Sequence, residues 1–283
     1  MSLERMLGDI SAAITHDEIG MAYGHVDGHV LRSAYEPVYR LHAGRLAIVG
    51  ARALMRPSRG SRPADPTRFL DRVGGVDHLM LDCLCRSLQI ANLPFLDLET
   101  RTLALRVDPA PLPQLKIVLA CLRAATDALE QDGFDRPRIV CELANHDSED
   151  FAASAALIRT YGFRVALCDA GPNPAGIAAV TIATPDYVRF DGAWFRSVAT
   201  LPDAMDLLAR LVVRLHAQEI EVLIDGIETT SHFEAAREAG ADMLQGFLFA
   251  PPILAGTAFR QRPLRLLELL QPRAKVIALR RPA

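Results

Sequence analysis

Two carboxylates and one amide follow apolar segments near the C-terminus. Asp225 and Glu228 flank Gly226 directly after the apolar run 222–224, and Gln245 follows the next apolar run. Carboxylate and amide oxygens are the ligands that hard cations such as Mg²⁺ or Mn²⁺ prefer. Cation binding is therefore one chemistry that these residue types allow, provided that further acids converge on the same place.

Those side chains must be positioned by the elements around them. From about residue 97 onward, short apolar runs alternate with longer amphipathic stretches. This rhythm predicts a parallel sheet with helical crossovers, and about six such units in a row favour a closed barrel over an open sheet. The expected strands are Thr102–Val107, Arg138–Leu143, Arg164–Cys168, Tyr187–Phe190, Glu221–Ile224 and Met243–Phe247, and the expected helices are Leu112–Gln131, Asp147–Tyr161, Pro202–Gln218 and Thr230–Ala239.

The front of the chain has a different pattern. Val30–Leu41 and Arg45–Met55 are apolar-rich runs separated by a three-residue turn, which indicates an antiparallel hairpin. One long helix is expected over Pro66–Ala91, because Pro66 suits a first helical turn.

Three segments are expected along the chain. Residues 1–29 read as an N-terminal extension, an amphipathic helix followed by a loose linker. Residues 30–260 form the barrel domain. Residues 261–283 are expected to hold a C-terminal helix over Leu264–Leu270 and then a solvated basic tail.

Motifs in the order of the chain resemble the EAL domain family of bacterial cyclic-diguanylate phosphodiesterases. The resemblance covers roughly residues 31–253. The family's signatures Y-Q-P-I, E-A-L-x-R, P-D-x-x-K-x-D, A-E-G-V-E and Q-G-Y correspond here to Tyr35-Glu36-Pro37-Val38, Arg52-Ala53-Leu54-Met55-Arg56, Pro185-Asp186-Tyr187-Val188-Arg189-Phe190-Asp191, Ile224-Asp225-Gly226-Ile227-Glu228 and Gln245-Gly246-Phe247. It implies an α/β fold, a (β/α)₈ TIM-type barrel whose first strand is antiparallel, with two divalent cations at the C-terminal mouth.

Several of the metal ligands that the resemblance implies are replaced. Arg52 stands at the Glu of E-A-L, Arg106 at an Asn, and Cys168 at the first Asp of D-D-F-G. A guanidinium has no acceptor atom and cannot ligate a metal, and a thiol is a poor ligand for Mg²⁺. We therefore expect no bound Mg²⁺ or Mn²⁺, no metal site and no phosphodiesterase activity.

The remaining site residues fall into two groups. The remnants of the catalytic acids are Glu142, Asp169, Asp225 and Glu228, and the ligand-binding candidates are Arg52, Arg56, Arg106, Arg189, Asp191 and Gln245. Two roles stay open for Arg52 and Arg106. They pair with Glu142 and Asp169 as a structural salt-bridge cluster, or they face outward and bind a phosphate bidentately.

Composition narrows the function classes. The net charge of −3 gives no general attraction to nucleic acid or anionic membrane. No apolar run reaches the roughly 18 residues of a membrane span, residues 1–20 do not read as a signal peptide, and five scattered cysteines are typical of reduced thiols in the cytoplasm.

Three functions remain. The first is a non-catalytic signalling regulator that binds an unidentified protein in bacterial cyclic-di-GMP-related signalling. The second is a metal-independent cyclic-di-GMP receptor, against which Glu36 argues because the family's Gln there faces a guanine. The third is an active phosphodiesterase or a hydrolase of altered specificity. By resemblance, the chain is also expected to form homodimers.

Overall fold

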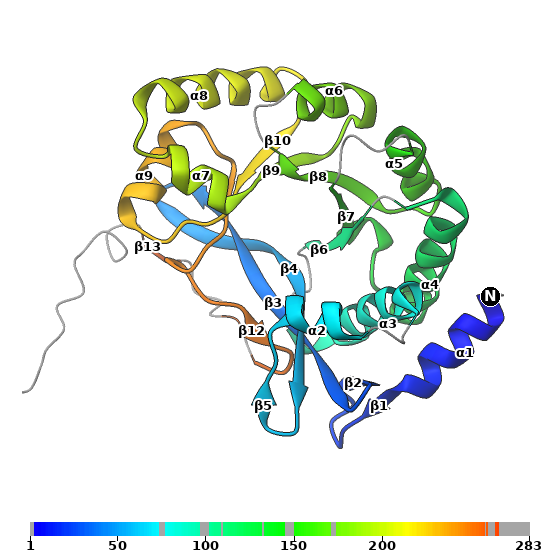
Figure 1. Cartoon of the computed structure of the whole chain (residues 1–283). Coiled ribbons are helices and arrows are strands. Elements are labelled where there is room, and N and C mark those ends of the chain that lie inside the picture. The colour runs from blue at the N-terminus through cyan, green and yellow to red at the C-terminus, as the bar shows by residue number, and fades with distance from the viewer. Residues whose placement is uncertain are drawn as a thin grey trace, which may run out of the picture.

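The computed structural model describes residues 3–73, 77–96, 102–108, 110–131, 133–144, 150–170, 174–257, 259 and 264–265. A closed barrel is its central feature (Figure 1). Its strands follow one another around the ring in the order β3, β11, β10, β9, β8, β7, β6 and β4, and pairing of β3 with β4 closes the ring. The bounds of these eight strands are β3 His29–His42, β4 Arg45–Arg59, β6 Thr102–Val107, β7 Ile139–Leu143, β8 Arg164–Ala170, β9 Tyr187–Phe190, β10 Glu221–Ile224 and β11 Met243–Leu244.

The first barrel strand runs against its neighbours. β3 is antiparallel to both β4 and β11, whereas the other neighbouring pairs around the ring are parallel. β3 and β4 are joined by Ala43 and Gly44, whose φ angles are 49° and 71°. Two consecutive positive φ values match the right-handed twist of the strands that they connect. The expected (β/α)₈ barrel with an antiparallel first strand is confirmed.

Helices surround the barrel (Figure 1). They cover the outer face of the sheet, and the main core lies between the two layers. In chain order the helices after the hairpin are α2 Pro66–Arg72, α3 His78–Ala91, α4 Leu112–Glu130, α5 Phe151–Thr160, α6 Pro174–Ala183, α7 Gly192–Val198, α8 Pro202–His216 and α9 Thr230–Glu238, with short 3₁₀ turns at Leu93–Leu96 and Arg136–Arg138. Among the described residues, no helix is both long and apolar enough to cross a membrane.

The single helix expected over Pro66–Ala91 is wrong. The structure divides it into α2 and α3. Asp65 caps α2 by accepting the N–H of Arg68 at 2.9 Å, and Asp77 caps α3 by accepting the N–H of Leu79 at 2.9 Å. The second cap starts a new helix because a capping carboxylate satisfies N–H groups that have no helical partner.

The N-terminal segment is more ordered than expected. Helix α1 (Leu3–Ala13) is present and buries Met6 and Ile10. The loose linker is wrong, because β1 (Ile14–His16) and β2 (Ala22–Val26) form a hairpin that extends the sheet through β3.

Short strands complete the sheet after the barrel. β5 (Arg62–Pro63) pairs with β4, and β12 (Ile253–Leu254) pairs with β3. β13 (Leu264–Arg265) pairs with β4, so the helix expected over Leu264–Leu270 is wrong at its first two residues. The rest of that segment and the basic tail lie outside the described residues.

The barrel interior is filled by an apolar cluster with polar residues above it. The cluster consists of Val38, Val140, Ala166, Tyr187, Leu223 and Met243. Alternate residues of a strand share one face, so the residue two positions nearer the mouth also points inward. On the reversed strand β3 this is the residue two positions earlier. These mouth-side residues are Glu36, Glu142, Cys168, Arg189, Asp225 and Gln245.

Candidate functional site

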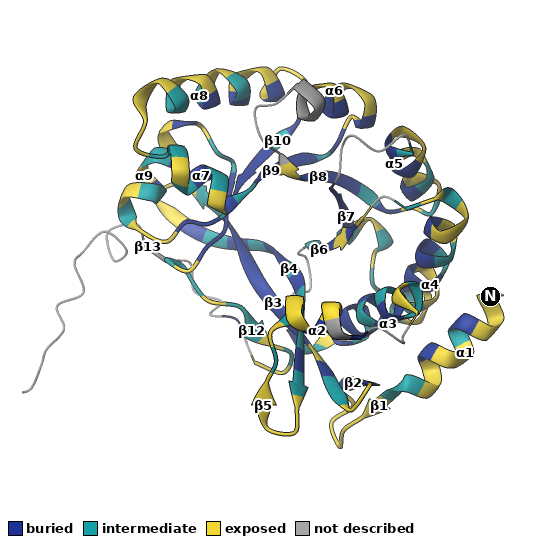
Figure 2. Cartoon of the chain, viewed as in Figure 1, coloured by how far each residue is buried: buried dark blue, intermediate teal, exposed yellow. Residues whose placement is uncertain are grey.

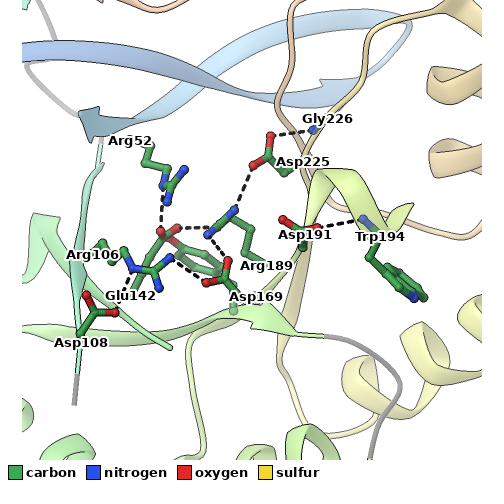
Figure 3. A network of polar contacts seen from close by, with 11 residues as sticks. Arg52, Arg106, Asp108, Glu142, Asp169, Arg189, Asp191, Trp194, Asp225 and Gly226 are labelled. Atoms are coloured by element: carbon green, nitrogen blue, oxygen red, sulfur yellow. Dashed lines mark hydrogen bonds and ion pairs between the residues drawn. The ribbon is translucent and has the colours of Figure 1, made fainter. Parts of the chain in front are cut away.

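Arg189 lies at the centre of an ion-pair network at the mouth of the barrel (Figure 3). Its guanidinium reaches three carboxylates, those of Glu142 on β7, Asp169 on β8 and Asp225 directly after β10. Nη1 lies 2.9 Å from Oδ2 of Asp225, Nη2 lies 3.0 Å from Oδ1 of Asp169, and Nε lies 3.4 Å from Oε1 of Glu142. A buried guanidinium is stable only when such partners compensate for its lost hydration, and here all three of its nitrogens face a carboxylate.

Glu142 is the most enclosed acid of the network. The Nε atom of Arg52 lies 3.1 Å from Oε2 of Glu142, and the hydroxyl of Tyr187 donates to Oε1 at 3.0 Å. Burial by itself would raise the pKa of Glu142, but Arg189, Arg52 and the Tyr187 hydroxyl outweigh burial and hold that pKa below its usual value. Glu142 is therefore a fully paired carboxylate.

Asp169 links a second arginine to the network. The Nη1 atom of Arg106 lies 2.7 Å from Oδ2 of Asp169, and its Nε lies 2.9 Å from Oδ1 of Asp108. The backbone of Asp169 has a φ of 55°, and the register of β8 shifts between Leu167 and Ala170. A bulge of this kind redirects a side chain, and here it accompanies the pairing of Asp169 with two guanidiniums.

A further acid, Glu36, lies beside the network and was not among the expected site residues. It is buried and faces Arg52 directly across the β3–β4 ladder. Burial and the neighbouring Asp225 carboxylate raise the pKa of Glu36 to about 7, against the opposing effect of Arg52, Arg189 and Arg56. This carboxyl group therefore changes its protonation near neutral pH.

Two of the expected site residues lie apart from the network. The Oε1 atom of Glu228 pairs with Nη1 of Arg196 at 3.1 Å, on α7. Asp191 accepts the N–H of Trp194 at 2.8 Å and caps α7. This cap gives the Asp191 carboxylate a structural role that needs no ligand.

Two further ligand-binding candidates, Gln245 and Arg56, are not paired with another side chain within the described residues. Gln245 is completely buried, and neither its side-chain oxygen nor its nitrogen has a hydrogen-bond partner there. Arg56 is half-buried on β4, and it has no ion pair with a carboxylate in that part of the chain.

A pocket of about 460 Å³ opens beside the network, between α2, α3, α4, the middle of β4 and the end of β6. Arg52 and Arg106 line it together with Arg86. The Arg86 guanidinium donates to the carboxylate of Asp82 and to the backbone carbonyl of Arg106, and its Nε has no hydrogen-bond partner among the described residues. Burial lowers the pKa of Arg86 to about 10. The remaining lining is largely apolar, from Leu70, Leu79, Leu81, Leu115 and Val118.

The donor set does not fit the pair of divalent cations that the family resemblance implies. Arg52, Arg106 and Arg189 present only N–H donors, which cannot coordinate a cation. The oxygens of Glu142, Asp169 and Asp225 already accept from these arginines. No cluster of three or more His, Cys, Asp or Glu in the described residues has the arrangement of a metal site.

Sequence reasoning missed several contacts of the network. Tyr187 stands two positions before Arg189 on β9, so strand periodicity alone would have placed both side chains in the barrel interior. Asp108 follows Arg106 by two positions and was readable in the same way. The contribution of Arg86 carried no sequence signal, because it depends on how α3 packs against β6.

The chain is similar to known proteins along most of its length. The family model of the EAL domain matches residues 26–252. The oxygen sensor protein DosP of Escherichia coli (strain K12) is 22% identical over 249 residues, which cover 81% of this chain and 29% of DosP. The uncharacterized protein Rv1354c of Mycobacterium tuberculosis is 22% identical over 249 residues, which cover 83% of this chain and 38% of that protein. The chain thus spans less than two-fifths of these curated relatives.

Solved structures share the fold. The calcium and cyclic-diGMP complex of Klebsiella pneumoniae BlrP1 has a TM-score of 0.68 and 21% identity, covering 80% of this chain and 57% of that chain. The c-di-GMP-bound form of a standalone EAL protein from Vibrio cholerae O395 has a TM-score of 0.67 and 20% identity, covering 81% of this chain and 94% of that chain. The family model matches well over half of the chain, and the chain therefore belongs to the EAL domain family.

Proposed function

We propose that this EAL domain is a non-catalytic regulator that acts by binding a protein partner in bacterial cyclic-di-GMP-related signalling. One observation carries the proposal. Arginines stand where the family resemblance places metal ligands, and Arg52, Arg106 and Arg189 bind the carboxylates of Glu142, Asp169 and Asp225. Two-metal hydrolysis needs those carboxylate oxygens for the cations. A barrel that has lost such chemistry remains a rigid scaffold for a partner.

The proposal is tested by measuring hydrolysis of cyclic di-GMP with Mg²⁺ and with Mn²⁺, following the linear dinucleotide by chromatography. We expect no product above that of a buffer control, with an active phosphodiesterase as the positive control. Turnover that disappears in EDTA would overturn the proposal, because it requires metal ligands that the network does not offer.

A second candidate is a metal-independent cyclic-di-GMP receptor, and two features favour it. Arg56 has no ion-pair partner among the described residues, and the pocket beside Arg52 and Arg106 could hold a planar group next to these cations. BlrP1 and the Vibrio cholerae protein were both solved with this nucleotide.

Calorimetric titration with cyclic di-GMP in EDTA distinguishes the two candidates. Binding that is retained in EDTA and lost in Arg56→Ala supports the receptor. Absence of heat up to high micromolar nucleotide supports the protein-binding regulator. Homodimerisation stays a prediction by family resemblance, and sedimentation equilibrium of the purified chain checks it.

A further inference from the structure

Two pairs of arginines face each other along the β3–β4–β5 ladder. Arg32 on β3 lies opposite Arg56 on β4, and Arg59 on β4 lies opposite Arg62 on β5. Like charges directly opposite each other in an antiparallel ladder repel and destabilise the sheet. The two pairs belong to different ladders, and because Arg56 and Arg59 are three positions apart on β4 they point to opposite faces of the sheet.

The outer pair has no compensating charge in the described part of the chain. Neither Arg59 nor Arg62 forms an ion pair there, and both are exposed. The hairpin projects away from the barrel, and its tip is exposed (Figures 1 and 2). Arg59 and Arg62 therefore present two uncompensated positive charges at the tip, on a chain whose net charge is −3.

The turn holds this charge in a fixed place. Gly60 has a φ of 59°, and the two-residue turn Gly60–Ser61 sets Arg59 and Arg62 opposite each other. The N–H of Ala64 donates to the carbonyl of Pro57 at 2.9 Å and closes the base of the β4–β5 hairpin. Each of these guanidiniums can bind a carboxylate through two parallel hydrogen bonds.

We propose that Arg59 and Arg62 form a docking site for an acidic segment of a protein partner. The inference rests on the proposed function, since it names the kind of partner that the regulator binds. Sites for single-stranded nucleic acid combine positive charge with aromatic side chains that stack on bases, and residues 56–63 contain no aromatic residue. An extended polyanion would also meet the negative charge of the rest of the molecule, whereas a short acidic peptide needs only the tip.

The test compares two variants of the whole chain that lose the same charge. One is R59S/R62S, and the control is R210S/R214S on α8, where both arginines are exposed and have no ion pair with a described residue. Fluorescence anisotropy at low ionic strength measures binding of a fluorescein-labelled octaglutamate peptide and of an oligothymidylate of the same length. We expect the wild type to bind the peptide, R59S/R62S to bind it about tenfold more weakly, and the control variant to match the wild type.

Thermal unfolding supplies a second readout. Removal of the repulsion is expected to raise the melting temperature of R59S/R62S above that of the wild type. A lower melting temperature would show that the tip arginines have favourable partners within the chain, and it would overturn the premise. Equal peptide binding by both variants, or no peptide binding by the wild type, would overturn the docking site, as would tighter binding of the oligothymidylate. These results are independent of the hydrolysis assay, so either proposal can fail without the other.

Discussion

The Nε atom of Arg189 lies 3.4 Å from Oε1 of Glu142 inside the barrel, and both side chains are almost fully buried, with 2% and 1% exposed. Their charges compensate each other in a region with little water, and Asp169 and Asp225 complete the surroundings of the guanidinium. Removing one partner of a buried ion pair leaves the other charge without compensation, which costs far more than the pair contributes as a whole. The stability of the mouth therefore depends on this arginine.

Arg189→Met is predicted to lower the free energy of unfolding by about 3–5 kcal/mol. Methionine is similar in size to arginine but carries no charge, so three carboxylates lose their cation. Urea denaturation measures this change. The matched control is Arg164→Met, whose guanidinium pairs with Asp186 at 2.8 Å while 36% and 30% of the two side chains are exposed. The control should change stability by less than about 1 kcal/mol. Equal effects of the two substitutions would contradict the network's importance.

Returning the family's ligand types to the mouth should create affinity for a metal. In R52E/R106N, two cations are replaced by a carboxylate and an amide near Glu142 and Asp169. Without metal, we expect this variant to melt below the wild type, because the new carboxylate repels Glu142. Millimolar Mn²⁺ should raise its melting temperature by several degrees and leave the wild type unchanged, since a ligand that binds only the folded state stabilises it.

Direct counting of bound Mn²⁺ by electron paramagnetic resonance gives a readout that does not depend on folding stability. Mn²⁺ binding by the wild type at this site, detected by either method, would refute the view that guanidiniums exclude the cations.

The barrel could be predicted from the sequence because its signal is local. Each strand is a short apolar run next to an amphipathic stretch, and the turn at Ala43–Gly44 indicates the reversed first strand. The division of the helix after β5 was missed, although the adjacent Gly74 and Gly75 are a breaker signal in the sequence and the cap at Asp77 marks the new start. The β1–β2 hairpin was missed because its strands have three and five residues, too few for a period to show.

The site could be predicted only as a set of residue types. The family resemblance placed Arg52 and Arg106 near Glu142 and Asp169, but not which atom meets which. It gave Arg189 only as a ligand-binding candidate, not as the centre of the network. Periodicity would have placed Glu36 in the interior, yet its raised pKa depends on burial and on Asp225, which is far away in the sequence. Gln245 looks like a ligand contact in the motif, and only the fold reveals that it has no exposed surface.

The pKa of Glu36 predicts a specific dependence of stability on pH. Because this pKa is raised from 4.5 to about 7 in the folded protein, the folded state binds the proton more tightly than the unfolded state does. The contribution of Glu36 to the free energy of unfolding is therefore greatest below about pH 4.5 and is lost as the pH rises through about 7. Glu36→Gln should be more stable than the wild type at pH 8, by up to about 3 kcal/mol, and this advantage should vanish towards pH 4.5.

Chemical denaturation of the two proteins across this pH range measures the difference. Glu234→Gln, at an exposed position on α9, is the control and should run parallel to the wild type. An advantage of Glu36→Gln that stays constant with pH would mean that Glu36 is ionised at every pH examined.

At the acid end, Glu142 and Asp169 act in the opposite direction. Despite burial, Arg189 and Arg52 lower the pKa of Glu142, and Arg189 and Arg106 lower the pKa of Asp169. The stability that these two acids contribute is therefore lost as the pH falls.

Gly226, in the turn after β10, is predicted not to tolerate a side chain. Its φ is 74°, and a Cβ atom there would lie 2.6 Å from Cα of Gly192 and would also clash with Nη1 of Arg196. Gly226→Ala combines a left-handed backbone, which costs about 1–2 kcal/mol, with overpacking, which costs about 1–3 kcal/mol. Gly28→Ala is the matched control, because Gly28 has a φ of 70° and a Cβ atom added to it would meet no described atom within 4 Å. Urea denaturation should therefore separate the two variants by the overpacking alone, and equal losses of stability would show that α7 moves away from the Asp225–Gly226 turn at little cost.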